Sequence, residues 1–428
     1  MFSLSQRGIT LSERRRFLTN AAIGGISALS MPLVLRKRLN LVTQARQGSP
    51  VTPSPTGGHL RIIDVKSDVV QEPAGRRRHY AFLRVETAAG LYGIGEVATA
   101  GEHPTALLSR LPAIKQALLG KDASAIEAHW LEMEMSAEPA GRNVPRPLQA
   151  AINTALWDVY GKSLSSPVYK FSGGPTRTKV RVYAEIEASS ATDLVATARQ
   201  LIAAGVRTLR ISLLELGRLE DGPRRIRPLI RRMEKLRSDL GDETDLILDC
   251  KGRLPASDAA TLGAALEPLH FLWLSDPCHS VDRGLYAKLS NETVTPLGIS
   301  GAIRNATEAM EFLRQHAIDV IETPLAEGGG ISGLRRIANM AETYYVALAP
   351  AAGDGPVATA AGLQFAATVS NFYILGMRLP LEEENRKMRQ ELHQSSLETA
   401  KEGFLELPMK AGLGIELNTA ALEKYRAG

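Results

Sequence analysis

A regular alternation of short β-rich runs and helical stretches begins at Val180 and recurs about every 26 residues. This pattern is typical of repeated β–α units that build a parallel sheet. Eight such runs follow one another, and eight units close a barrel. The sequence therefore predicts an α/β protein with a (β/α)8, TIM-like barrel over residues 179–385. The runs are Arg181 to Ile186, Thr208 to Leu213, Leu246 to Asp249, Phe271 to Leu274, Thr295 to Ile299, Asp319 to Glu322, Tyr345 to Ala349 and Phe372 to Leu375.

A second pattern precedes the barrel and predicts an N-terminal α+β capping domain over residues 59–178. Its expected strands and helices are Leu60 to Val69, Tyr80 to Val85 and Gly90 to Glu96, then Pro104 to Leu118, Ala125 to Met135 and Leu148 to Ser163. The final segment, 386–428, has strand and turn character between Glu402 and Leu417. We expect this segment to return to the capping domain.

The composition is that of a globular protein. With 428 residues, 44% hydrophobic and 23% charged, the chain can bury a large core over two or three domains. Its net charge of +5 is small for this length, and Arg14 to Arg16 with Arg36, Lys37 and Arg38 are enough to supply all of it. The charge therefore gives no argument for a nucleic-acid partner. A basic run over residues 224–237 alternates with apolar residues at helical spacing, which predicts a solvated helix face.

The first 58 residues read as an export signal and a linker. Arg14, Arg15, Phe17 and Leu18 resemble a twin-arginine signal, and a modest apolar stretch follows from Ala21. This reading predicts an exported protein, periplasmic or at the cell envelope, whose membrane contact is limited to the signal. The alternative is a disordered basic tail. The next residues, 44–58, are rich in Pro, Ser, Thr and Gly, as linkers are.

Cys250 and Cys278 are too few for a disulfide framework. They follow neighbouring predicted strands, so a bond between them stays open. Strand geometry favours thiols that point apart.

Nine short motifs agree in order and spacing with one known family. The motifs are Ala155-Leu-Trp-Asp158, Gly161-Lys162, Pro167-Val-Tyr169, Gly173-Gly174, Val180-Arg-Val-Tyr183, Asp249-Cys-Lys-Gly-Arg-Leu254, Leu274-Ser-Asp-Pro277, Gly329-Gly-Ile331 and Ala349-Pro350. The first five resemble the entry to the barrel in the mandelate racemase branch of the enolase superfamily, and the others resemble its sugar-acid dehydratases of the galactonate and mannonate type. The likeness runs from about Leu60 to the C-terminus.

The resemblance implies a magnesium site made by carboxylates at three successive strand ends, which stabilises an enolate after a base removes the proton beside a carboxylate. In this chain the three positions are Asp249, Ser275 and Gly301, so only the first is acidic. Asp276 matches a second carboxylate that points elsewhere in the family, and it is the nearest substitute ligand.

The positions that would move protons also depart from the family. Lys251 stands where these dehydratases place a histidine acid, and Arg210 with Ser212 stands where a Lys-x-Lys pair is common. The remaining expected acidic and histidine positions hold Pro324, Ala351 and Gly376.

The leading hypothesis is a non-catalytic barrel that binds a small carboxylate or sugar acid through Arg210, Lys251 and Arg304, with no cofactor. Ser212, Glu322 and His103 are further candidates at the barrel mouth, His103 because cap loops cover the mouth in relatives. Glu322 and Glu185 end strands and are expected to pair with Arg210 or Lys251. A salt bridge to a neighbour is the competing reading for Arg304. For Lys251 two readings compete: its ammonium pairs with Asp249 and Asp276 in place of the metal, or it reaches into solvent.

The alternative is a magnesium-dependent sugar-acid dehydratase or racemase-type lyase with a rearranged site. Lys251 would then act as acid or base beside a metal on Asp249. A structural protein at the cell envelope is the third reading. By analogy with relatives, we expect a homo-oligomer.

Overall fold

The computed structural model describes residues 60–100, 103–135, 144–186, 191–212, 224–279 and 283–427. The predicted export signal and linker lie outside these residues. Within the described ranges, no helix combines the length and apolar character that a bilayer crossing requires.

The capping domain is built on a three-stranded antiparallel sheet in the order β1-β2-β3. The strands are β1 (Ile62–Gln71), β2 (His79–Thr87) and β3 (Tyr92–Val97), and the helices are α3 (Thr105–Leu108), α4 (Leu111–Leu118), α5 (Ile126–Met135), α6 (Arg146–Ser163) and α7 (Val168–Phe171). Helix α6 lies directly against β3 and buries most of its length. This close approach requires glycine, because a Cβ at Gly95 would lie only 1.9 Å from the carbonyl oxygen of Ala151.

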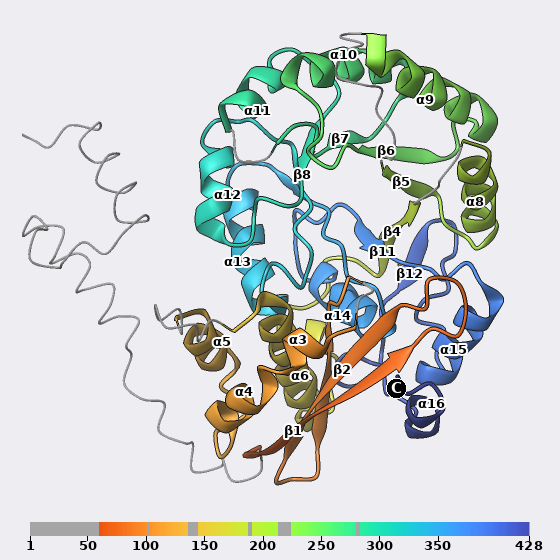
Figure 1. Cartoon of the computed structure of the whole chain (residues 1–428). Helices are drawn as coiled ribbons and strands as arrows, with labels where there is room; N and C mark the ends of the chain where they lie inside the picture. Colours follow the sequence, from red (N-terminus) through yellow and green to blue (C-terminus); the bar gives the residue numbers. More distant parts are fainter. Residues whose placement is uncertain are drawn as a thin grey trace, which may run out of the picture. The chain divides into compact units, whose positions relative to one another are not determined.

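The barrel follows, with eight parallel strands ringed by helices (Figure 1). Its strands are β4 (Lys179–Ile186), β5 (Thr208–Ser212), β6 (Asp245–Asp249), β7 (Trp273–Ser275), β8 (Leu297–Ile299), β9 (Val320–Ile321), β10 (Ala347–Leu348) and β11 (Leu375–Met377). Neighbours in the chain are neighbours in the sheet from β4 to β10, and β11 pairs with β4. Parallel bridges from Leu348 to Phe372 and from Ala351 to Gly376 join β10 to the β11 region and close the ring.

Eight helices alternate with these strands along the described chain. They are α8 (Ala191–Ala203), α9 (Arg227–Leu240), α10 (Ala256–Leu266), α11 (Arg283–Ser290), α12 (Ala306–Leu313), α13 (Gly330–Glu342), α14 (Pro356–Ala366) and α15 (Glu383–His393). The predicted barrel architecture is confirmed, and all eight predicted strand runs coincide with a strand or overlap it. The basic run on α9 is only partly the solvated face that was expected. Arg225 and Arg237 are buried, and Arg237 donates to backbone carbonyls that include Thr244 O at 2.7 Å.

Two separate apolar layers hold the barrel. The larger one lies between the strands and the helices. The smaller one fills the inside of the barrel with Tyr183, Ile247, Trp273, Val320, Ala349 and Ile374. Strand alternation places the residues two positions further along each strand above this inner layer. The inner layer is therefore the floor on which Asp249, Ser275 and Glu322 stand.

The C-terminal segment contacts both domains. Strand β12 (Phe404–Glu406) pairs antiparallel with β4, and helix α16 (Thr419–Lys424) lies near β1. Asp158 on α6 is fully buried and accepts backbone N–H groups from Ile94 at 2.9 Å and from Leu413 at 2.8 Å. One carboxylate thus ties the cap sheet, the central cap helix and the C-terminal segment together. Because burial raises the pKa of Asp158 to about 6, these hydrogen bonds matter for keeping it ionised.

The seam between cap and barrel is fixed by buried hydrogen bonds. The Trp130 indole donates to Gly329 O at 2.7 Å. The side chains of Asn153 and Trp157 both donate to the hydroxyl of Ser332, at 2.9 and 3.0 Å. Because buried donors must find partners, these contacts select one docking position of the cap over the barrel.

Candidate functional site

The strand ends named by the sequence meet inside the barrel. The sheet register places Ser212 beside Asp249 and Asp249 beside Ser275. Asp249, Ser275 and Glu322 are at most 1% exposed, so they lie in the dry interior rather than on the rim. Arg210 comes from β5, is 4% exposed, and reaches this group of oxygens.

One nitrogen of Arg210 lies at the centre of the group. Its Nη2 is 2.9 Å from Ser275 Oγ, 3.1 Å from Asp249 Oδ2 and 3.5 Å from Glu322 Oε2. Its Nη1 is 3.3 Å from Glu185 Oε1. The expected pairing of Glu185 and Glu322 with Arg210 is confirmed. We call Arg210, Glu185, Asp249, Ser275 and Glu322 the barrel-centre cluster.

The charges of this cluster are only partly satisfied. Burial raises the pKa of Glu322 from 4.5 to about 7, although the charge of Arg210 opposes the shift. Within the described chain, neither carboxylate oxygen of Glu322 accepts a hydrogen bond. Burial alone would lower the pKa of Arg210, but Glu322, Tyr183 and Asp249 raise it well above its usual range. Arg210 therefore stays charged, while Glu322 is poised to take up a proton near neutral pH.

Lys251 contacts the carboxylate of Asp249, and a turn after β6 places it there. Strand β6 ends at Asp249, and Lys251 has a φ of 54°, in the left-handed region that side chains rarely adopt. Its backbone N–H donates to Asp249 Oδ1 at 2.9 Å, and its Nζ lies 2.7 Å from Asp249 Oδ2. A local turn, and not the alternation of a strand, therefore sets the direction of the Lys251 side chain. Its side chain is 44% exposed, so both expected readings hold in part: it pairs with Asp249 and it meets solvent.

The described residues do not fit a magnesium site. Nowhere in the described ranges do three or more His, Cys, Asp or Glu side chains gather to hold a metal ion. Asp276 has a φ of 40° and accepts the backbone N–H of Ser300 at 3.0 Å, and burial raises its pKa. A side chain at Gly301 would have open space around its Cβ, but glycine offers no ligand. The guanidinium of Arg210 takes the point at which oxygens from three strands converge.

The remaining predicted site residues are Ser212, which adjoins Asp249 in the sheet, and Arg304 and His103, whose described contacts lie elsewhere. Ser212 is buried at the end of β5. Arg304 is half-exposed, and its guanidinium meets Glu308 at 3.4 Å, which is the salt bridge that competed with ligand binding. His103 lies on the cap, where it contacts Thr105 and packs edge-on against His79 with ring centroids 4.8 Å apart.

A cavity of about 160 Å³ lies where the cap meets the ends of β4 and β11. Three arginines line it, two from the cap and one from the barrel: Arg76, Arg78 and Arg378. Glu185 lines the same cavity and also pairs with Arg210, so the cavity borders the barrel-centre cluster. The site residues predicted from the sequence included none of these three arginines. A larger hollow of about 470 Å³ lies on the cap near Lys66 and Arg84, away from the strand ends.

The two cysteines are free thiols in the structure, and both are buried. The disulfide that the sequence left open is therefore not formed here. Burial raises the pKa of the Cys250 thiol well above its usual range, which keeps it protonated and unreactive.

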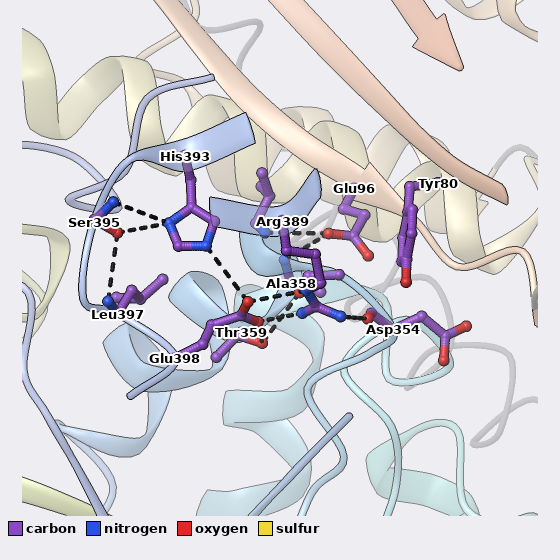
Figure 2. A network of polar contacts seen from close by, with 12 residues as sticks. Tyr80, Glu96, Asp354, Ala358, Thr359, Arg389, His393, Ser395, Leu397 and Glu398 are labelled. Atoms are coloured by element: carbon purple, nitrogen blue, oxygen red, sulfur yellow. Dashed lines mark hydrogen bonds and ion pairs between the residues drawn. The ribbon is translucent and has the colours of Figure 1, made fainter. Parts of the chain in front are cut away.

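A second buried charge cluster lies around α14 and α15 and borders the cap at Glu96 (Figure 2). Arg389 on α15 donates to both carboxylate oxygens of Glu398 and, at 2.6 Å, to Asp354 O. Glu398 also accepts from Thr359 at 3.2 Å and lies 3.5 Å from His393. We call Arg389, Glu398, Thr359, His393 and Asp354 the seam cluster. No signal in the sequence pointed to it, because its members come from two separate stretches of the chain, 354–359 and 389–398.

Glu96 lies beside the seam cluster and caps a helix. Its carboxylate accepts the backbone N–H groups of Val357 and Ala358 at the start of α14, at 3.1 and 3.0 Å (Figure 2). Helix N-termini favour a negative charge at this position. Burial nevertheless raises the pKa of Glu96 to about 7.

Comparison with known proteins identifies a family for each of the two domains. Residues 193–421 match the family of enolase C-terminal domain-like proteins, and residues 70–173 match the N-terminal domain of mandelate racemase and muconate lactonizing enzyme. The chain belongs to the enolase superfamily. The predicted membership of this superfamily is therefore confirmed for both domains.

Two similar enolase-superfamily relatives of this chain are described as D-galactonate dehydratases. That of Variovorax paradoxus is 32% identical over 285 residues, which is 67% of this chain and 74% of the relative. That of Verminephrobacter eiseniae is 29% identical over 350 residues, which is 81% of this chain and 91% of the relative.

Solved superfamily structures share the whole fold. A mandelate racemase/muconate lactonizing enzyme-like protein from Rubrobacter xylanophilus has a TM-score of 0.76 and 25% identity, covering 86% of this chain and 98% of its own. An enolase from Agrobacterium radiobacter, bound to sodium and L-malate, has a TM-score of 0.75 and 26% identity, covering 86% and 95%.

Proposed function

We propose that this chain is a non-catalytic member of the enolase superfamily that binds a small sugar acid or related hydroxy acid. The observation that carries the proposal is the position of Arg210 Nη2, within 3.5 Å of Asp249, Ser275 and Glu322. Superfamily chemistry requires concentrated positive charge where an enolate forms. A guanidinium that already faces two carboxylates has its charge compensated, so it is a poor electrophile for that purpose.

The cavity at the cap–barrel seam is the proposed ligand site. Guanidinium groups bind carboxylates through paired hydrogen bonds, and three of them line this space. Its volume of about 160 Å³ lies well below the roughly 300 Å³ of pockets that take drug-sized ligands, which suits a small acid. Glu72, Glu185 and Glu382 lie on the same walls and would accept hydrogen bonds from the hydroxyl groups of a sugar acid.

Binding and turnover can be measured together. The full chain is incubated in heavy water with a panel of sugar acids that begins with D-galactonate, with and without magnesium, and followed by NMR. We expect shifts on binding and no deuterium at the carbon beside the carboxylate. Arg378→Met should weaken binding about tenfold. Arg231→Met, an exposed arginine on α9, should leave it unchanged. Exchange or dehydration by the unmodified chain would refute the non-catalytic proposal.

The alternative function is a magnesium-dependent sugar-acid dehydratase with a rearranged site. Two observations favour it: the D-galactonate dehydratases among the relatives, and Lys251, which is half-exposed and 2.7 Å from Asp249. A lysine in that place would serve as acid or base. This function requires deuterium exchange that depends on magnesium and disappears in Lys251→Met.

Two further proposals concern the setting of the protein. We propose that the twin-arginine-like segment directs export of the chain. The double change Arg14→Lys with Arg15→Lys should abolish export, as measured by comparing the amounts of the protein in the cell fractions.

We also propose that the chain forms a homo-oligomer. Light scattering of the purified chain should then give a mass that is a multiple of 46.2 kDa.

A further inference from the structure

We infer that the guanidinium of Arg210 is a built-in replacement for a divalent cation, and that the oxygens around it form a latent cation site which opens when this side chain is removed. The inference goes beyond ligand binding, because it concerns the barrel interior and holds whether or not a sugar acid binds at the seam. It explains why carboxylates remain at the centre of a barrel whose other metal-ligand positions hold serine and glycine.

Three side-chain oxygens surround one guanidinium nitrogen, which stands where a metal ion would otherwise have to be. Oxygens of Asp249, Ser275 and Glu322 come from three different strand ends and converge on the single atom Arg210 Nη2. These oxygens are hard donors of the kind that magnesium and manganese prefer. No metal is required in this chain as it stands, because the nitrogen already supplies a positive charge at that point.

The surrounding residues make room for these oxygens. A Cβ at Gly298 would lie 2.3 Å from Glu322 Oε1, and a Cβ at Gly376 would lie 2.4 Å from the hydroxyl of Tyr183. Any larger residue at either position would therefore collide with the Glu322 carboxylate or with the Tyr183 phenol. Tyr183 and Trp273 form an apolar floor directly beneath. The site is thus enclosed by fixed walls and would persist as a cavity without Arg210.

The charges make the cavity attractive to a cation. Glu322 is 0% exposed, and within the described chain its only ion pair is with Arg210. Asp249 has a second cation in Lys251, but Glu322 has none. Without Arg210, an uncompensated carboxylate would remain in a dry interior, where unpaired charge is strongly disfavoured. A small cation or a proton must then take the place of the guanidinium charge.

The decisive experiment measures cation binding by the full chain and by Arg210→Ala. Manganese binding is followed by electron paramagnetic resonance, and melting temperature is recorded with magnesium, with manganese and with guanidinium at low concentration. We expect no bound manganese and an unchanged melting temperature in the original chain. Arg210→Ala should bind about one manganese ion per chain, and its lowered melting temperature should rise with ion concentration as ligand linkage requires.

Two variants show where the ion binds. Adding Glu322→Gln to Arg210→Ala should abolish manganese binding. Lys251→Met removes the other cation from Asp249 but keeps Arg210 in place, and it should bind none. Stoichiometric manganese in the original chain would overturn the inference, and so would a folded Arg210→Ala that ignores every cation.

A different comparison decides the matter if Arg210→Ala does not fold. Arg210→Lys keeps a positive charge in the site, whereas Arg210→Met keeps only the bulk. We expect the lysine variant to melt at a higher temperature than the methionine variant. Equal melting temperatures would show that Arg210 only fills space, and the inference would fail. Ligand titrations at the seam distinguish this failure from failure of the proposed function.

Discussion

The barrel-centre cluster and the seam cluster each bury an arginine against carboxylates, yet the two differ in how well the charges are satisfied. The side chains of Arg210 and Arg389 are 5% and 2% exposed. Glu398 accepts two hydrogen bonds from Arg389 and one from Thr359, and it lies beside His393. Glu322 is less well satisfied: among the described residues its ion pair is the 3.5 Å contact with Arg210, and the Ser275 side chain is its other polar neighbour.

The pKa values of the two carboxylates move in opposite directions. Burial would raise both. At Glu398 the charge of Arg389 and the hydrogen bond from His393 outweigh burial and lower the pKa. At Glu322 burial outweighs Arg210 and raises the pKa to about 7. Burial of a charge pair is therefore not a measure of stability. The fully bonded cluster holds the fold together, and the loosely bonded one retains the electrostatic character of a site.

The largest expected effect is at the seam cluster. Arg389→Met leaves the buried carboxylate of Glu398 without its cation and should cost about 3–5 kcal/mol of unfolding free energy, measured by urea denaturation. Lys424→Met is the control, because its ion pair with Glu391 lies at the surface, is screened by water and should change the unfolding free energy little. Equal small losses in the two variants would remove the contrast between the clusters.

The next effect is a pH dependence at the barrel centre. Because the pKa of Glu322 is raised from 4.5 to about 7 on folding, its contribution to stability is complete below about pH 4.5 and is lost as the pH rises through about 7. The loss should reach about 3 kcal/mol. In Glu322→Gln the fall in unfolding free energy between about pH 5 and about pH 8 should be smaller by this amount.

Glu423→Gln, an exposed surface change, serves as the control for this pH series and should follow the original profile. The raised pKa values of Asp158 and Glu96 persist in both variants, so the difference between them isolates Glu322. A profile for Glu322→Gln that matches the original would show that this carboxyl is as well satisfied as Glu398.

A pair of buried tyrosines tests the same difference on a smaller scale. The Tyr80 hydroxyl, near Arg389, donates to Glu72, whereas the Tyr183 hydroxyl, beside Arg210, has no well-formed hydrogen bond within the described chain. Tyr80→Phe should cost about 1–2 kcal/mol, and Tyr183→Phe should cost less than about 0.5 kcal/mol. Thermal unfolding of both variants measures the two losses. A larger loss for Tyr183→Phe than for Tyr80→Phe would contradict the claim that the barrel centre is the less well bonded of the two clusters.

The smallest effect is expected at Lys251. Its pair with Asp249 is 44% exposed on the lysine side, so Lys251→Met should change the unfolding free energy by less than about 1 kcal/mol. Arg210 still faces Asp249 in this variant. A loss of several kcal/mol in urea denaturation would mean that Lys251, rather than Arg210, is the main cation of the barrel centre.

The barrel was predictable because each strand is short and local. The run from Leu246 to Asp249 becomes β6 with one extra residue, and the others shift by a few residues at most. The convergence of Asp249 and Ser275 also followed from the sequence, since parallel strands in register bring their ends together. From the sequence, Glu322 was expected to pair with either Arg210 or Lys251, and it pairs with Arg210. The geometry of this pair was not expected, because the reach of a long side chain depends on the floor formed by Tyr183 and Trp273.

The sequence by itself determined the barrel, the cap and the absence of carboxylates at Ser275 and Gly301, because periodicity and residue type are properties of the chain alone. The tertiary structure decided which cation stands at the strand ends and how the cap is held. Both depend on side chains that meet across hundreds of residues, such as Glu96 and Ala358. Local sequence carries no record of such distances, and burial, which sets the charge of Glu322, exists only once the chain has folded.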